Sequence, residues 1–138
     1  KLDRGEYGAL ILAEAGLTRL GLTERISYRF SPEEMIPAAG QGIMAVQGRV
    51  GEFSELLENL NDPNSELCAK TERMLSKELG GDCSSPIGCF AAIDGDIMTL
   101  RGFYGVGDKP VSGCISGKTD DSEQLVKSLA AQLKAQDD

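Results

Sequence analysis

One cysteine of this chain lies where its thiol can be reached. Cys83 belongs to the stretch LGGDCSSPIG, residues 79–88, between a segment with helical periodicity and a segment typical of a strand. Two glycines after a helical pattern supply the left-handed φ that ends a helix, and Pro86 suits the first residue of a strand. The sequence therefore predicts an accessible turn that presents Cys83. The plain alternative is a small residue that only fills the turn.

The surroundings of Cys83 do not favour a thiolate. Asp82 precedes it, and the helix before the turn presents its negative C-terminal end, so both disfavour a charged sulfur. The chain has no histidine and no C-x-x-C pair, which excludes the common zinc patterns, Ser/His or Cys/His catalysis and a C-x-x-C redox centre. A stable covalent carrier fits better, because a thiol that meets a very electrophilic partner once needs little activation.

The composition is that of a soluble globular protein with one domain or slightly more. Of 138 residues, 41% are hydrophobic, and no apolar run is long enough to predict a membrane span. The net charge of −8 disfavours nucleic acid and anionic membranes as partners. The cysteines fit no small disulfide framework, so we expect a cytoplasmic protein. Three of them are expected in the core: Cys68, Cys89 and Cys114.

Three strand-like runs follow the Cys83 turn. They cover residues 87–93, 97–104 and 111–116. Asp94-Gly95 is a tight-hairpin signal between the first two runs, and Gly107-Asp108 lies in a looser turn before the third. The runs and their turns predict an antiparallel meander.

Amphipathic helices flank this meander. A short helix at residues 52–60 precedes one capped by Asn64 or Ser65, whose apolar positions share one face: Leu67, Cys68, Thr71, Met74, Leu75 and Leu79. Residues 122–136 predict a last helix with one apolar side: Leu125, Val126, Leu129 and Leu133. The order predicts an α+β domain at residues 51–138, with a three-stranded antiparallel sheet and helices on one face.

The first 50 residues predict only part of a domain. Residues 7–13 have the pattern of a buried strand that leads into a short helix at residues 14–20, and residues 42–49 predict another strand. A lone strand and helix cannot bury both faces of the strand, so a partner sheet is missing. We therefore expect residues 1–50 to be a partial α/β segment from adjoining domains.

The Cys83 stretch resembles the cofactor-attachment loop of the porphobilinogen deaminase family, also called hydroxymethylbilane synthases. Other segments resemble the family in the same order: LDRGEY at 2–7, ILA at 11–13, AGLTRLGL at 15–22, PAAGQG at 37–42 and TER at 71–73. Each of these segments alone is a weak signal. Together with LGGDCSSPIG they are specific, and they run from residue 2 to about residue 93.

The resemblance implies a dipyrromethane cofactor joined to Cys83 by a thioether. It also implies that Arg19 pairs with acetate or propionate groups of the pyrrole chain, because a planar guanidinium suits carboxylates. Four further residues are expected to line the cofactor cleft: Leu12, Ala13, Gln41 and Gly42. Without the resemblance, Arg19 would be an exposed charge and the others a strand end and a turn. No metal site is expected.

By the same resemblance, the parent protein is a transferase of tetrapyrrole and heme biosynthesis. It joins four porphobilinogen units head to tail, with loss of ammonia, into hydroxymethylbilane. The matched region lacks the family's N-terminal domain, most of its second domain and the aspartate that handles protons, so no catalytic residue is assigned. We expect a C-terminal fragment, inactive alone.

In this interpretation, residues 1–50 hold part of domain 2 and the return strand to domain 1, and residues 51–138 form the cofactor-bearing C-terminal domain. The expected partners are porphobilinogen, the growing linear tetrapyrrole and the missing N-terminal domains. The alternative is an independent α+β regulatory or ligand-binding module in which Cys83 is merely structural.

Overall fold

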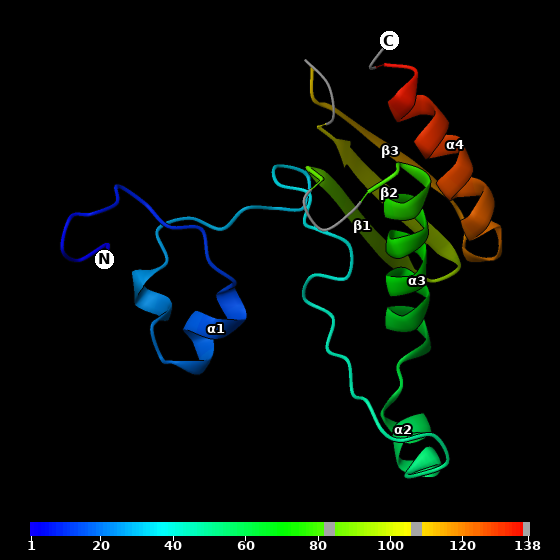
Figure 1. Ribbon diagram of the computed structural model, residues 1–138, viewed down its shortest axis with the longest axis horizontal. Helices are drawn as coiled ribbons and strands as arrows, with labels where there is room; N and C mark the ends of the chain where they lie inside the picture. Colours follow the sequence, from blue (N-terminus) through cyan, green and yellow to red (C-terminus); the bar gives the residue numbers. More distant parts are fainter. Residues whose placement is uncertain (82–84, 106–108, 137–138) are drawn as a thin grey trace. The chain divides into compact units, whose positions relative to one another are not determined.

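A computed structural model of the chain describes residues 1–81, 85–105 and 109–136 (Figure 1). The chain divides into two compact units, Lys1–Phe30 and Ser31–Asp138. The predictions for Cys83 and for the turn at Gly107-Asp108 fall outside the described residues.

The larger unit contains a three-stranded antiparallel sheet in the order β1-β2-β3. Its strands are β1 (Ile87–Asp94), β2 (Ile97–Tyr104) and β3 (Val111–Lys118). Asp94 pairs with Ile97, so Gly95 and Asp96 are the central residues of the first hairpin. Gly95 has the positive φ, 58°, that such a turn requires. The predicted meander is confirmed.

The longest helix, α3 (Pro63–Glu78), is capped by Asp62 and not by Asn64 or Ser65. The Asp62 carboxylate accepts a 2.7 Å hydrogen bond from the backbone amide of Ser65. Pro63 is the first helical residue, where the N–H that proline lacks would have no helical partner. The predicted cap was wrong because a proline after a polar residue starts a helix as readily as it ends a loop.

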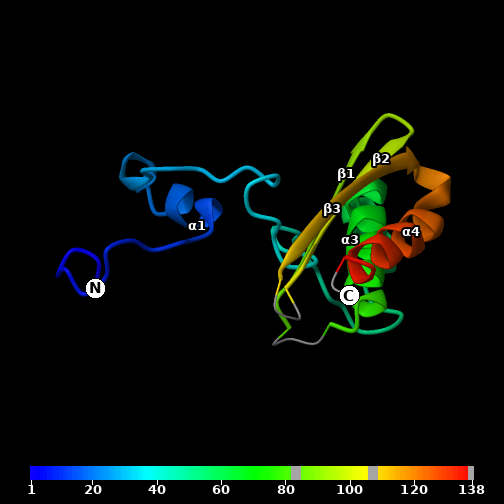
Figure 2. The ribbon, with the colours of Figure 1, turned by 90° about the horizontal axis from the view of Figure 1, so that it is seen from above.

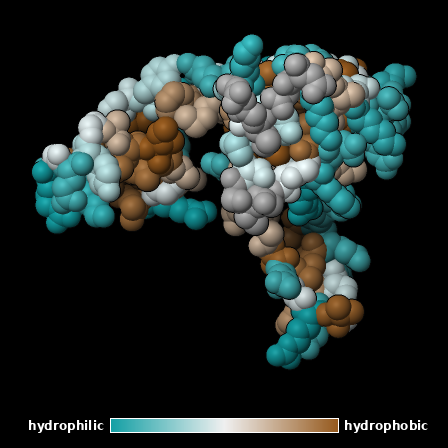
Figure 3. Space-filling model, turned by 45° about the horizontal axis from the view of Figure 1, so that its top comes forward, coloured by the Kyte–Doolittle hydropathy of each residue, from teal (hydrophilic) through white to brown (hydrophobic). Residues whose placement is uncertain are grey.

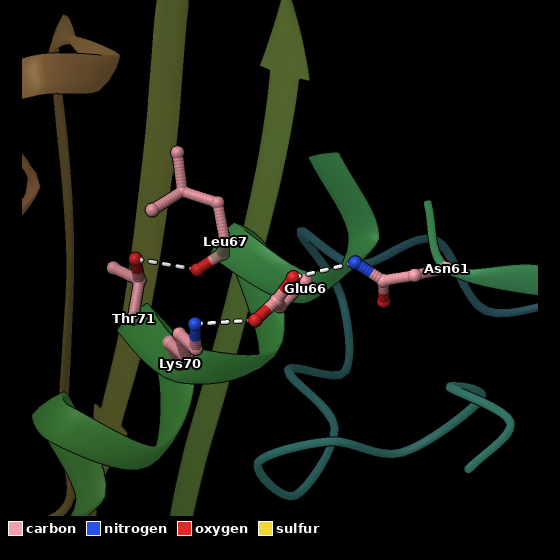
Figure 4. Close-up of polar contacts among 5 residues, drawn as sticks. All are labelled: Asn61, Glu66, Leu67, Lys70 and Thr71. Atoms are coloured by element: carbon pink, nitrogen blue, oxygen red, sulfur yellow. Dashed lines mark hydrogen bonds and ion pairs between the residues drawn. The ribbon is translucent and has the colours of Figure 1, made fainter. Parts of the chain in front are cut away.

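Side-chain contacts stabilise the first turns of α3 (Figure 4). The Asn61 amide nitrogen donates a 2.6 Å hydrogen bond to the Glu66 carboxylate, and Lys70 forms an ion pair with the same carboxylate. One turn later the buried Thr71 hydroxyl donates a 2.8 Å hydrogen bond to the Leu67 carbonyl oxygen. The buried hydroxyl is therefore hydrogen-bonded, so the core contains no unsatisfied donor at Thr71.

Helices α3 and α4 (Ser122–Lys134) cover one face of the sheet, as Figure 2 shows. α3 packs against β1, and α4 packs against β2 and β3. The core between these layers is formed by Cys68, Leu75, Leu79, Cys89, Ala91, Met98, Leu100, Leu125, Val126, Leu129, Ala130 and Leu133. The predicted α+β fold and the apolar faces of both helices are confirmed, with Leu67 and Met74 partly buried at the edge of the core.

The residues before α3 form only short helices. These are α1 (Glu14–Arg19), the 3-10 turn η1 (Thr23–Arg25) and α2 (Ser54–Leu60); a second 3-10 turn, η2 (Thr119–Asp121), precedes α4. The strands predicted at residues 7–13 and 42–49 are not formed. A strand needs a neighbour for its amide and carbonyl groups, and no described residue pairs with either segment.

Large apolar side chains remain exposed before α3. Figure 3 shows hydrophobic surface on the segment that carries α2 and on the Lys1–Phe30 unit. The exposed side chains include Ile11, Leu12, Leu20, Met44, Val50 and Phe53. Among the described residues after residue 60, Ile97 is the one large apolar side chain that is exposed.

Candidate cofactor site

Residues 38–43 form two overlapping turns. The Gln41 amide donates to the Ala38 carbonyl over 3.0 Å, and the Ile43 amide donates to the Gly40 carbonyl over 3.2 Å. The Gln41 side-chain oxygen accepts a 3.3 Å hydrogen bond from the Ala38 amide, so the Gln41 side chain stabilises the turn to which Gln41 itself belongs. Gly40 and Gly42 have φ values of 78° and 86°, which L side chains rarely adopt.

The side of the turn at Gly42 is open. A Cβ atom built on Gly42 would meet no heavy atom within 4 Å. A ligand can therefore approach the backbone of this turn closely, because glycine has no side chain that would block it.

The predicted residues at α1 lie together on a short segment. Leu12 is exposed, Ala13 is the N-cap of α1 with extended backbone, and Arg19 is the last residue of α1 and exposed. The other arginines of Lys1–Phe30 each pair with a carboxylate: Arg4 with Glu6, Arg25 with Asp3 and Arg29 with Glu14. Arg19 forms no ion pair with any described residue, so its guanidinium is available to an external carboxylate.

Two of the described cysteines are buried, as predicted. Cys68 and Cys89 belong to the core, where burial raises the pKa of both thiols. The pKa of Cys89 rises to about 12, first through burial and then through the nearby Glu72 carboxylate. Both sulfurs are therefore protonated and shielded near neutral pH, which makes them poor nucleophiles.

Cys114 is exposed, so the prediction that it belongs to the core was wrong. β3 alternates between partly buried and exposed residues, and Gly113 and Ile115 occupy the partly buried positions. A Cβ atom on Gly113 would lie 3.0 Å from the Leu129 side chain, so α4 packs directly on this glycine. Cys114 points to the opposite face because successive residues of a strand alternate in direction.

The flanks of the Cys83 loop behave as the sequence predicts. α3 ends at Glu78, and Gly80 follows in the left-handed conformation with φ of 80°. β1 starts at Ile87, one residue after Pro86. α3 and β1 are thus the elements that precede and follow residues 82–84 in the chain.

Glu72 is the residue of this region whose place in the core we did not anticipate. It is 4% exposed and lies on the buried face of α3. The signal was its position in the helical period, because residues 68, 72, 75 and 79 follow one another along a single face. A search for apolar residues alone does not predict that a glutamate at such a position is buried.

Each of the two units, taken by itself, offers one feature that suits a carboxylate-bearing pyrrole cofactor. Arg19 offers an unpaired guanidinium in one compact unit, and Gln41 and Gly42 offer an open backbone turn in the other. No cluster of potential metal ligands occurs in residues 1–81, 85–105 and 109–136. In the same residues, no helix has the length and apolar character needed to cross a membrane.

Comparison with known proteins extends these observations over most of the chain. The family model described as "porphobilinogen deaminase, dipyromethane cofactor binding domain" matches residues 1–55, and the one described as "porphobilinogen deaminase, C-terminal domain" matches residues 66–135. The order of the two matches follows the order of the motifs in the sequence.

Curated relatives carry the same name. The porphobilinogen deaminase of Chromobacterium violaceum is 43% identical over 137 residues, covering 96% of this chain and 44% of the relative. The porphobilinogen deaminase of Nitrosomonas europaea is 42% identical, and the match covers 98% of this chain and 45% of the relative. The porphobilinogen deaminase of Ruminiclostridium josui is 40% identical, and the match covers 98% of this chain and 47% of the relative. The chain thus spans about half the length of the curated relatives it matches. It belongs to the porphobilinogen deaminase family.

Proposed function

We propose that this chain supplies the C-terminal part of a transferase that polymerises four porphobilinogen units into hydroxymethylbilane. The observation that carries the proposal is the ordered match to both descriptions of the family, with the LGGDCSSPIG loop inside the second. The first description names cofactor binding, and its residues 1–55 include the candidates Leu12, Ala13, Arg19, Gln41 and Gly42.

In this proposal Cys83 supplies the sulfur that holds the cofactor. Its thiol adds to the cationic carbon that is left when a pyrrole loses its aminomethyl nitrogen as ammonia. A carbon–sulfur bond forms and the thiol proton is released, so the atoms balance without an oxidant. The bound dipyrromethane supplies the primer from which the chain of pyrroles is extended.

Arg19 and the glycine turn have binding roles in this proposal. The Arg19 guanidinium pairs with the acetate or propionate groups of the pyrroles, since a planar fork donates two parallel hydrogen bonds to a carboxylate. Gln41 and Gly42 present backbone to the cofactor, and the open space at Gly42 supports this role. These groups bind and orient the cofactor, and none of them is assigned the transfer of protons.

The expected partner of residues 1–60 is the part of the porphobilinogen deaminase fold that this chain does not contain, its N-terminal domains. Each of the two units leaves large apolar side chains exposed, Ile11 in Lys1–Phe30 and Met44 and Val50 in Ser31–Asp138, and such side chains favour a partner that covers them. The remainder of the fold would also bring the carboxyl group that, as the acid, protonates the departing amine and then, as the carboxylate, stabilises the cationic pyrrole.

The experiment compares the complete gene product with the 138-residue chain. Each is incubated with porphobilinogen, and ammonia and linear tetrapyrrole are measured by mass spectrometry. We expect turnover by the complete product and none by the 138 residues alone. Turnover by the short chain would show that the proton-handling group lies within it. A complete product that binds no dipyrromethane and releases no ammonia would refute the proposal and favour an independent ligand-binding module.

A further inference from the structure

Glu72 places a carboxylate in the core between three segments of the chain. One oxygen accepts a 2.7 Å hydrogen bond from the Gly40 amide, and the other accepts a 2.9 Å hydrogen bond from the Ala91 amide. Glu72 forms no ion pair with any described residue. A buried carboxylate is tolerated where strong donors satisfy its oxygens, and here two backbone amides do so.

The segment that leads to the glycine turn lies along the edge of the sheet. The Cys89 amide of β1 donates a 2.7 Å hydrogen bond to the Pro37 carbonyl oxygen. A Cβ atom on Gly88 would lie 2.6 Å from the Ile36 carbonyl oxygen, so the two backbones meet where β1 has no side chain. Glu72 is therefore the second attachment of a segment that already pairs with β1.

Glu72 also connects the two elements that flank the Cys83 loop. It belongs to α3, which ends at Glu78 before the loop, and it binds Ala91 in β1, which begins at Ile87 after the loop. Its remaining hydrogen bond holds Gly40, one residue before Gln41. A single side chain thus links the glycine turn to both flanks of the loop.

We propose that Glu72 is a positioning residue, which holds the turn of Gln41 and Gly42 in a fixed place against α3 and β1, the two elements between which Cys83 lies in the sequence. This inference rests on the proposed function, in which the turn and the loop contact the same cofactor. Glu72 itself touches neither substrate nor cofactor and acts through the Gly40 amide.

The test replaces Glu72 by glutamine, which is nearly the same size. Glutamine has one acceptor oxygen, so it can accept a hydrogen bond from only one of the two amides, Gly40 or Ala91. Its NH₂ group would face the other amide, and two donors cannot form a hydrogen bond with each other. The matched control is Glu78→Gln, which makes the same change of charge at an exposed position of the same helix. Should Glu72→Gln fail to fold, Glu72→Asp, which keeps the charge but shortens the reach, replaces it with the same expected direction.

The first measurement is amide hydrogen exchange in the 138-residue chain. In Glu72→Gln we expect exchange at Gly40 or Ala91 to accelerate about tenfold, the factor that one lost hydrogen bond represents. The Leu129 amide in α4 and the Glu78→Gln control should exchange at the wild-type rate. Equal acceleration of all amides would show that Glu72 stabilises the fold as a whole and would overturn the inference.

The second measurement uses the complete gene product below its unfolding temperature. Per mole of folded, cofactor-loaded enzyme, we expect Glu72→Gln to lower kcat about tenfold and to leave KM for porphobilinogen unchanged, because the turn orients the bound cofactor. A lower Tm with unchanged kcat would mean a purely structural role and would refute the inference. If the wild-type product itself neither loads cofactor nor turns over, the proposed function fails, and the exchange data alone decide whether Glu72 holds the turn.

Discussion

The backbone amide of Cys89 donates a 2.7 Å hydrogen bond to the carbonyl oxygen of Pro37. The bond covers part of the open edge of β1, where unpaired amides would otherwise face solvent. It ties the segment before the glycine turn to the sheet, and Ser31–Asp138 forms one compact unit. A domain boundary between residues 50 and 51, as the motifs indicate, remains a prediction that deletion can test.

We expect a protein comprising residues 31–138 to be more stable than one comprising residues 51–138. Deletion of residues 31–50 removes the hydrogen-bond partners of the Cys89 amide and of one Glu72 oxygen and exposes both groups to water, at a net cost of about 0.5–1.5 kcal/mol each. Urea denaturation followed by circular dichroism measures the difference. Equal midpoints for the two proteins would instead support the boundary after residue 50.

Leu129 should be one of the most sensitive positions of the core. Its side chain is fully buried, and Leu129→Ala is expected to lower the free energy of unfolding by about 2–5 kcal/mol. Leu60→Ala is the matched control, because Leu60 is 60% exposed and its truncation should change stability by less than about 0.5 kcal/mol. Comparable losses in the two variants would mean that the helix–sheet core is not the main source of stability.

The thiol of Cys89 should make the protein less stable in alkali. Its pKa is raised by burial to about 12, from an ordinary value of 9.0. Above about pH 9 the unfolded chain releases this proton and the folded chain keeps it, so the free energy of unfolding falls as pH rises, by up to about 1.4 kcal/mol per pH unit. Below that pH the thiol is protonated in both states, so it does not make the free energy of unfolding depend on pH.

The measurement for Cys89 is the urea midpoint of wild-type protein and of Cys89→Ala between about pH 8 and about pH 10.5. The wild-type midpoint should fall faster with pH, because the variant lacks this thiol while the other titrating groups are shared. Parallel curves for the two proteins would show that Cys89 ionises as readily in the folded state as in the unfolded one.

Arg19 should contribute to binding of the pyrrole carboxylates in the complete gene product. Removal of a charge-assisted hydrogen bond in Arg19→Ala is expected to lower kcat/KM for porphobilinogen about 10–100-fold. Lys127→Ala is the control, because it removes the same charge at an exposed position of α4, outside residues 1–60. A loss of similar size in both variants would indicate an effect of net charge rather than a contact made by Arg19.

Local signals explain why the C-terminal part of the fold could be predicted from sequence. The hairpin at Gly95 and the helical faces around Leu75 and Leu129 depend on neighbours within a few residues, and each was found. The strands expected at residues 7–13 and 42–49 failed for the opposite reason. An apolar run becomes a strand only with a pairing partner, and no described segment supplies one.

Glycine packing explains the error at Cys114. In β3 the residues that face α4 include Gly113 and Gly117, and a Cβ on Gly117 would lie 2.8 Å from the Leu125 side chain. The helix therefore approaches the strand where side chains are absent, which a search for apolar residues does not detect. Glu72 escaped prediction similarly, because its partners are backbone amides that leave no mark in the sequence.

The position of Cys114 sharpens the test of the cofactor attachment. Cys68 and Cys89 are buried with raised pKa values, so Cys114 is the exposed competitor among the described cysteines. Intact-mass analysis of the complete gene product should find the dipyrromethane adduct in the wild type and in Cys114→Ser, and none in Cys83→Ser, because a hydroxyl is a far weaker nucleophile than a thiol. An adduct that persists in Cys83→Ser, or that disappears from well-folded Cys114→Ser, would contradict the assignment of Cys83 as the residue that carries the cofactor.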